Sequence, residues 1–131
     1  MSFTFANVQR VLVCGGRDYK DVEMLNQVLD AFEAQVGISC IIQGDAKGAD
    51  TLSRLWAVMR NIVHEDYPAQ WNKYGRRAGF LRNTQMLEEG KPDVVIAFPG
   101  GRGTAMMCRI ALGAGVKVYN VNTETRMMEA M

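Results

Sequence analysis

The chain is poor in several features that mark common protein classes. It has three prolines, one histidine and no apolar run near the ~20 residues needed to cross a membrane. Its three cysteines include no CxxC pair and no group with the spacing of zinc ligands, so no metal is expected. The single histidine, His64, lies in or beside an expected strand and is interpreted as structural. No Ser-His-Asp or Cys-His catalytic arrangement is therefore indicated.

The composition also bears on location and partners. The first residues, MSFTFANVQR, lack the basic start and long apolar stretch of a secretory signal. Cys14 and Cys40 lie in apolar runs, as reduced buried thiols do, and an odd cysteine count favours a reducing compartment. The formal net charge is only +1, which argues against a broad basic face for duplex nucleic acid. We expect a cytoplasmic protein with no membrane partner, and the charge disfavours a nucleic-acid partner.

Apolar segments suited to buried strands alternate with amphipathic helical segments. Strands are expected over 8–14, 39–43, 63–67, 93–98 and 116–121. Helices are expected over 21–36, 49–62, 74–89 and 103–114, and the tail 122–131 as a short helix or a frayed end. This alternation predicts an α/β fold with a doubly wound, mostly parallel sheet of about five strands. The expected strand order is 3-2-1-4-5. The apolar face of the second helix is expected to consist of Leu52, Leu55, Trp56 and Met59.

Three glycine-rich loops each follow an expected strand and lead toward a helix. They read GGRD over 15–18, GDAKGAD over 44–50 and PGGRGT over 99–104. In a parallel sheet all three lie at the carboxyl edge, where open α/β sheets bind ligands at the point of reversed winding. With the expected strand order, GGRD and PGGRGT face each other across that point. Any one such loop is more often just a turn, whereas three at one edge indicate a cleft.

The residue types in these loops suit an anion. Glycine permits close backbone approach, and amide groups at a helix N-terminus attract phosphate. Arg17 and Arg102 can each supply a planar fork, and Thr104 can either cap its helix or donate its hydroxyl to a phosphate. Neither GxxxxGK[ST] nor GxGxxG is present, which argues against a P-loop or a standard dinucleotide fingerprint. The candidate ligand-binding residues here are Gly15, Gly16, Arg17, Gly44, Gly48, Ala49, Pro99, Gly100, Gly101, Arg102, Gly103 and Thr104.

A second unusual stretch, YPAQWNKYGRRAGFLRNTQM over 67–86, interleaves basic and aromatic residues. Trp71 is interpreted either as a platform for a base or as packing under the loop. Arg82 and Asn83 are assigned to the ligand site because their segment begins near the same sheet edge. Arg76 and Arg77 are interpreted as a solvated face.

Together these segments resemble the YspA-type (cpYpsA-related) branch of the SLOG superfamily, relatives of the LOG phosphoribohydrolases and of DprA/Smf. The resemblance extends from VLVCGGRDY through GDAKGAD, YPAQWNKYGRRAG and LRNTQM to VVIAFPGGRGT and AGVKVY. It implies a single SLOG-like, Rossmann-like domain over 1–131 that binds a nucleotide or a nucleotide-derived ligand without a cofactor. An ADP-ribose-like or NAD-like molecule and a nucleoside monophosphate both fit. A homo-oligomer, a dimer or larger, is also implied.

LOG enzymes cleave a nucleotide N-glycosidic bond with a PGGxGTxxE motif. The motif matches here through its threonine, but Met107 occupies the position of the glutamate. Arg82 looks similar to the arginine that those enzymes place beside their substrate. A carboxylate normally stabilises the ribosyl centre or activates water, which methionine cannot do. The replacement candidates at this edge are Asp18, Asp45 and Asp50, of which Asp45 departs from the glycine usual in this branch.

Two functions from different classes remain open. One is a binding module that acts as a sensor or a sponge, with a possible place in phage–host conflict. The other is a nucleotide N-glycosidase that uses an aspartate in place of the lost glutamate. Single-stranded DNA binding is a weaker third. Met106 and Met107 are interpreted either as part of a dimer interface or as core filling.

Overall fold

The computed structural model describes residues 8–131; most of the N-terminal stretch considered above for a signal lies outside this range. The strands are β1 (Gln9–Cys14), β2 (Ile38–Gln43), β3 (Val63–Asp66), β4 (Val94–Ala97), β5 (Lys117–Asn122) and β6 (Met127–Ala130). The helices are α1 (Val22–Gln35), α2 (Ala49–Met59), α3 (Trp71–Tyr74), the 3₁₀ helix η2 (Gly75–Arg77), α4 (Ala78–Gly90) and α5 (Arg102–Gly113). No helix in this range is long and apolar enough to cross a membrane.

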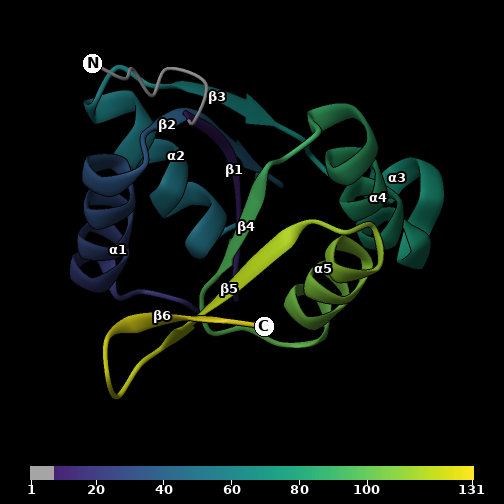
Figure 1. Ribbon diagram of the computed structural model, residues 1–131. Helices are drawn as coiled ribbons and strands as arrows, with labels where there is room; N and C mark the ends of the chain where they lie inside the picture. The colour runs from purple at the N-terminus through teal and green to yellow at the C-terminus, as the bar shows by residue number, and fades with distance from the viewer. Residues whose placement is uncertain (1–7) are drawn as a thin grey trace.

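One six-stranded sheet runs through the molecule in the order β3-β2-β1-β4-β5-β6. The first five strands are parallel, which confirms the α/β class, the mostly parallel sheet and the order 3-2-1-4-5. Helices α1 and α2 cover one face and α4 and α5 the other (Figure 1). Strand residues alternate between the two cores, so that Val11 and Val13 pack toward α1 and α2 while Leu12 and Cys14 pack toward α4 and α5.

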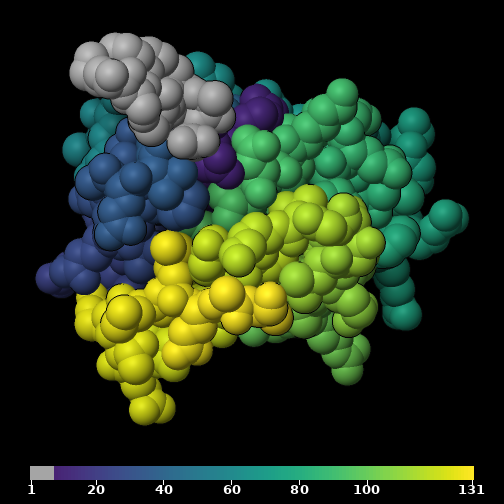
Figure 2. All heavy atoms as spheres, in the orientation of Figure 1, coloured from purple at the N-terminus to yellow at the C-terminus, as the bar shows by residue number. Residues whose placement is uncertain are grey.

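The C-terminal residues form a strand, so the expected short helix or frayed end over 122–131 is wrong. The side chain of Asn122 accepts hydrogen bonds from the backbone N–H groups of Glu124 and Thr125, an Asx turn that reverses the chain. Arg126 then adopts a left-handed conformation with φ of 59°, and β6 pairs antiparallel with β5. Arg126 also donates to Gln27 of α1. Figure 2 shows this hairpin, in yellow, lying between α1 and α5.

Helix α2 is rotated from the expected orientation. Leu55 and Met59 were expected on the buried face but are 45% and 80% exposed. The small residues Ala49, Ser53 and Ala57, spaced four apart, turn toward the sheet and are fully buried. The small side chains allow α2 to approach the sheet closely, and the hydrophobic pattern alone could not reveal that preference.

The three cysteine thiols are buried, and the single histidine contacts a neighbouring carboxylate. Cys14, Cys40 and Cys108 are free and buried. The imidazole Nδ1 of His64 lies 2.7 Å from an oxygen of Asp66 at the end of β3. No group of three or more histidine, cysteine, aspartate and glutamate side chains that could hold a metal ion occurs among residues 8–131.

Candidate functional site

The three glycine-rich loops meet at the carboxyl edge of the sheet through their backbones. The N–H of Gly16 donates to the carbonyl oxygen of Pro99 at 2.8 Å. The carbonyl oxygen of Gly16 accepts from the N–H of Ala49 at 3.2 Å. GGRD therefore lies against PGGRGT, as the strand order predicted, and GDAKGAD joins them.

Several of the glycines are needed for this contact between loops. A Cβ atom on Gly15 would lie 2.6 Å from the Cβ of Ala49, closer than packed carbon atoms approach. Gly48 has φ of 79°, and a Cβ there would collide with the carbonyl oxygen of Gly16. These glycines serve loop packing, whatever else they contact.

Two other glycines are open. A Cβ atom on Gly101 or Gly103 would meet nothing within 4 Å. Gly101 is the N-cap of α5 and offers no side chain to cap the helix. The backbone N–H groups of the first turn are therefore left for a ligand or solvent. Thr104 lies inside this turn, so the expectation that it caps the helix is wrong, while its side chain still lines the pocket described next.

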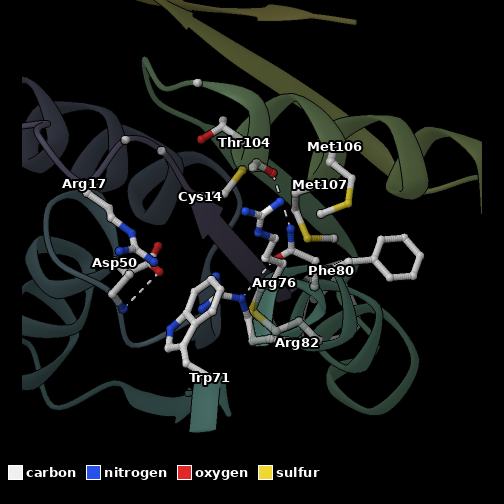
Figure 3. A pocket seen from close by; sticks show the side chains of 18 residues that line it. Cys14, Arg17, Asp50, Trp71, Arg76, Phe80, Arg82, Thr104, Met106 and Met107 are labelled. Carbon is white, nitrogen blue, oxygen red and sulfur yellow. Dashed lines mark hydrogen bonds between the residues drawn. The ribbon is translucent and has the colours of Figure 1, made fainter. Parts of the chain in front are cut away.

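A pocket of about 450 Å³ opens between these loops and α4 (Figure 3). Its volume falls within the range of small-molecule sites. The predicted residues that line it are Gly15, Gly16, Arg17, Asp50, Trp71, Arg82, Asn83, Gly101, Gly103 and Thr104. The pocket is therefore built from all three loops and from the 67–86 segment.

Other predicted site residues lie outside this pocket. Arg102 begins α5 with an exposed side chain, and Asp18 and Asp45 are exposed as well. The other predicted ligand-binding residues that do not line the pocket are Gly44, Gly48, Ala49, Pro99 and Gly100. Of the three aspartates considered for catalysis, the structure brings only Asp50 into the pocket.

Arg82 and Asn83 tie α4 to the loops. The guanidinium of Arg82 donates from Nη1 to the carbonyl oxygen of Gly44 and from Nε to the Asn83 side-chain oxygen at 2.9 Å. The Asn83 amide donates in turn to the carbonyl oxygen of Gly103 at 3.3 Å. Burial lowers the pKa of Arg82, and the nearby Asp50 carboxylate opposes that shift. Arg82 therefore holds the pocket together as well as lining it.

Asp50 is the buried carboxyl group of the pocket, with 8% of its surface exposed. Burial raises its pKa to about 6, although hydrogen bonds from the backbone of Ala46 and Gly44 and the charge of Arg82 favour the carboxylate. The Ala46 N–H donates to Oδ2 at 3.2 Å. A carboxyl group that titrates near neutral pH can accept a hydrogen bond from a hydroxyl or exchange a proton.

Trp71 lies at the mouth of the pocket and is 46% exposed. Its ring rests beside Gly79, and the guanidinium carbon of Arg17 lies 5.4 Å from the ring centroid. A ring this exposed does not fit the interpretation that Trp71 packs under the loop. Trp71 and Arg17 instead form a cationic and aromatic rim, seen on the left side of Figure 3.

Sequence reasoning missed part of the pocket wall. Arg76 and Arg77 are exposed, as interpreted, but Arg76 also lines the pocket together with Phe80 and Met106. The spacing of Arg76, Phe80 and Asn83 is that of one helical face, so this signal was present in the sequence. Met107 is 1% exposed and packs in the core, which excludes the interface interpretation for that residue.

Two comparisons with known proteins bear on this geometry. A family model described as the YspA, cpYpsA-related SLOG family matches residues 9–74, from β1 to α3. The chain belongs to this family. The Gene 61 protein of Mycobacterium phage D29 is 38% identical over 124 residues, which cover 86% of this chain and 96% of that protein. SLOG membership indicates a nucleotide-related function, and the matched residues include the GGRD and GDAKGAD loops.

The raised pKa of Asp50 predicts a pH-dependent stability effect in this SLOG protein. Because the folded pKa, about 6, exceeds the ordinary value of 3.8, ionisation opposes folding. The penalty is absent below about pH 4, grows up to about pH 6 and is constant above. Asp50→Asn should therefore stabilise the protein at pH 7.5 by up to about 3 kcal/mol, with no gain at pH 4. Chemical denaturation at both pH values measures this.

Asp18→Asn is the matched control, because Asp18 is exposed at the same sheet edge. It should change stability by less than about 0.5 kcal/mol. A gain for Asp50→Asn that is equal at both pH values would contradict burial of a carboxylate as its cause.

Proposed function

We propose that the protein binds a nucleotide or nucleotide-derived ligand in this pocket and acts as a sensor or a sponge for it. The observation that carries the proposal is the open, uncapped first turn of α5 inside a pocket that also holds Arg17 and Arg82. A helix N-terminus with free amides and two nearby guanidinium groups suits a phosphate. Family membership supports the nucleotide as the bearer of that phosphate.

The rest of the pocket suits the other parts of a nucleotide. Trp71 offers a half-exposed ring on which a base can stack, a contact worth about 1–3 kcal/mol. Asp50, in the buried wall, can accept hydrogen bonds from ribose hydroxyl groups. The pocket thus has a phosphate end, a sugar-facing carboxylate and an aromatic rim.

Cleavage of the N-glycosidic bond is the second candidate function, favoured by one observation. Asp50 is a pocket carboxyl group with a pKa raised to about 6, so near neutral pH it can give or accept a proton. In the hydrolysis, water adds to the ribose carbon while the proton it loses balances the one gained by the departing base. Met107 in the LOG glutamate position supplies no acid, and the binding role therefore remains the first proposal.

We also propose that the protein acts as a homo-oligomer and in a setting of phage–host conflict. The similarity to a phage protein supports the second point. The oligomer rests on the resemblance to the family.

A mass-spectrometric time course distinguishes binding from cleavage. The protein is incubated with nucleoside monophosphates, NAD, ADP-ribose and cyclic ADP-ribose, and the free, bound and denaturation-released species are compared. A sensor or sponge removes one compound from the free pool and releases it intact on denaturation. Accumulation of a free base or a ribose phosphate, lost in Asp50→Asn, would replace the binding role with catalysis. No depletion of any compound would contradict both.

Gly103→Ala separates ligand binding from stability. The residue lies in the first turn of α5, and a methyl group there enters open space beside the free amides. Alanine should stabilise the helix by about 0.5–1 kcal/mol and yet weaken nucleotide binding by obstructing the phosphate. Calorimetric titration and thermal melting measure the two effects.

Gly113→Ala is the control on the same helix. Gly113 also faces open space, at the last turn, and does not line the pocket. It should leave nucleotide affinity unchanged. Equal affinities for Gly103→Ala and Gly113→Ala would remove the first turn of α5 from the site.

A further inference from the structure

A second concave region shares Arg17 with the pocket. This groove, of about 410 Å³, runs between the GGRD loop and the start of α2. Its lining combines the basic side chains Arg17, Lys20 and Lys47 with Gly48 and Thr51 and with a larger apolar surface to which Tyr19, Val22 and Leu52 belong. No carboxylate among the described residues lines it.

The three basic side chains of the groove form no ion pair within the described chain. Arg10, Arg60 and Arg126 each pair with a carboxylate. Arg17, Lys20 and Lys47 form no such ion pair among residues 8–131. The lining of the groove thus contains three cations and no carboxylate, whereas the adjoining hollow that shares Arg17 and Lys20 is also lined by Asp18 and Asp21.

The backbone at the groove adds to its positive potential. Gly48 is the N-cap of the 11-residue helix α2 and makes no side-chain capping bond. The positive end of the helix dipole therefore lies beside Lys47, and Asp50 in the first turn of α2 offsets part of it. The N–H of Ala49 already donates to the carbonyl oxygen of Gly16 and is not free for a ligand. The two lysine side chains, rather than backbone amides, would therefore make most of the contacts with an anion.

Arg17 connects this groove to the nucleotide pocket. It lines both, and its guanidinium lies over Trp71 at the pocket mouth (Figure 3). Arg17 is therefore the one residue that the linings of the pocket and the groove have in common. An anionic group arriving there would meet a planar guanidinium first and two lysines beyond it.

We propose that Arg17, Lys20 and Lys47 form a second anion subsite, which takes an additional phosphate group of the bound ligand. This inference rests on the proposed function and narrows it. The preferred ligand carries at least two phosphates, either as a terminal diphosphate or as a pyrophosphate link, and is not a monophosphate.

The test compares AMP, ADP and ADP-ribose on the wild type and on the double variant Lys20→Gln/Lys47→Gln by calorimetric titration. The wild type should bind ADP or ADP-ribose at least about tenfold more tightly than AMP, since a phosphate gains charge-assisted contacts. The double variant should lose most of that advantage and keep its affinity for AMP. Preference for ADP indicates a terminal phosphate, and preference for ADP-ribose an internal one.

Lys91→Gln/Lys117→Gln is the control, because it removes the same charge from lysines that line neither the pocket nor the groove. It should preserve the advantage of the diphosphates. An advantage that is absent in the wild type, or that survives in Lys20→Gln/Lys47→Gln, would overturn the second subsite while AMP binding upholds the pocket.

A further experiment distinguishes failure of the nucleotide-binding proposal from failure of the second subsite. If no nucleotide binds, inorganic pyrophosphate tests the groove alone through the amide NMR signals of Lys20, Lys47 and Thr51. Shifts in the wild type that vanish in the double variant would support an anion site at the groove. No shifts would overturn it.

Discussion

The backbone of Gly16 joins the three loops on which the site depends. Its N–H donates to Pro99, and its carbonyl oxygen accepts from both Tyr19 and Ala49. These bonds fix GGRD, GDAKGAD and PGGRGT relative to one another at the edge where the parallel strands end. A side chain at Gly15 or Gly48 would force the loops apart. The pocket is therefore a consequence of close backbone approach, which glycine alone permits.

Two glycines that do not take part in this loop packing leave backbone amides available to a ligand. Gly101 and Gly103 face open space, so the first turn of α5 keeps its amides available. Arg82 and Asn83 hold that turn against α4 through the bond from Asn83 to the Gly103 carbonyl. The pocket is thus positioned by α4 before any ligand arrives, which lowers the entropic cost of binding.

The site also carries a cost in stability. Asp50 is ionised near neutral pH in a buried position, with Arg82 as a nearby charge and backbone hydrogen bonds as partial compensation. Arg17, Lys20 and Lys47 line one groove and form no ion pair in the described chain. A buried carboxyl group with a raised pKa at a concave edge is typical of a binding site.

The sequence predicted the parallel sheet and its strand order because strands and helices alternate along the chain, and that alternation is typical of a doubly wound sheet. It also predicted that the three loops share one edge. It could not distinguish the packed Gly48 from the open Gly103, because both read as loop glycines and only the partner backbone separates them. The prediction for α2 was right for Trp56 but wrong for Leu55, because Ala49 and Ala57 fit closer to the sheet than Leu55 would. The β6 strand depended on the turn at Asn122, a single side chain.

The most direct measurement is an amide NMR titration of the protein with AMP and with ADP-ribose. The account predicts that the largest shifts fall on the amides of Gly101, Gly103 and Thr104 and on the indole N–H of Trp71, with little change in the β5–β6 hairpin. Shifts centred elsewhere, or none at millimolar nucleotide, would contradict the claim that this glycine-built pocket holds the ligand.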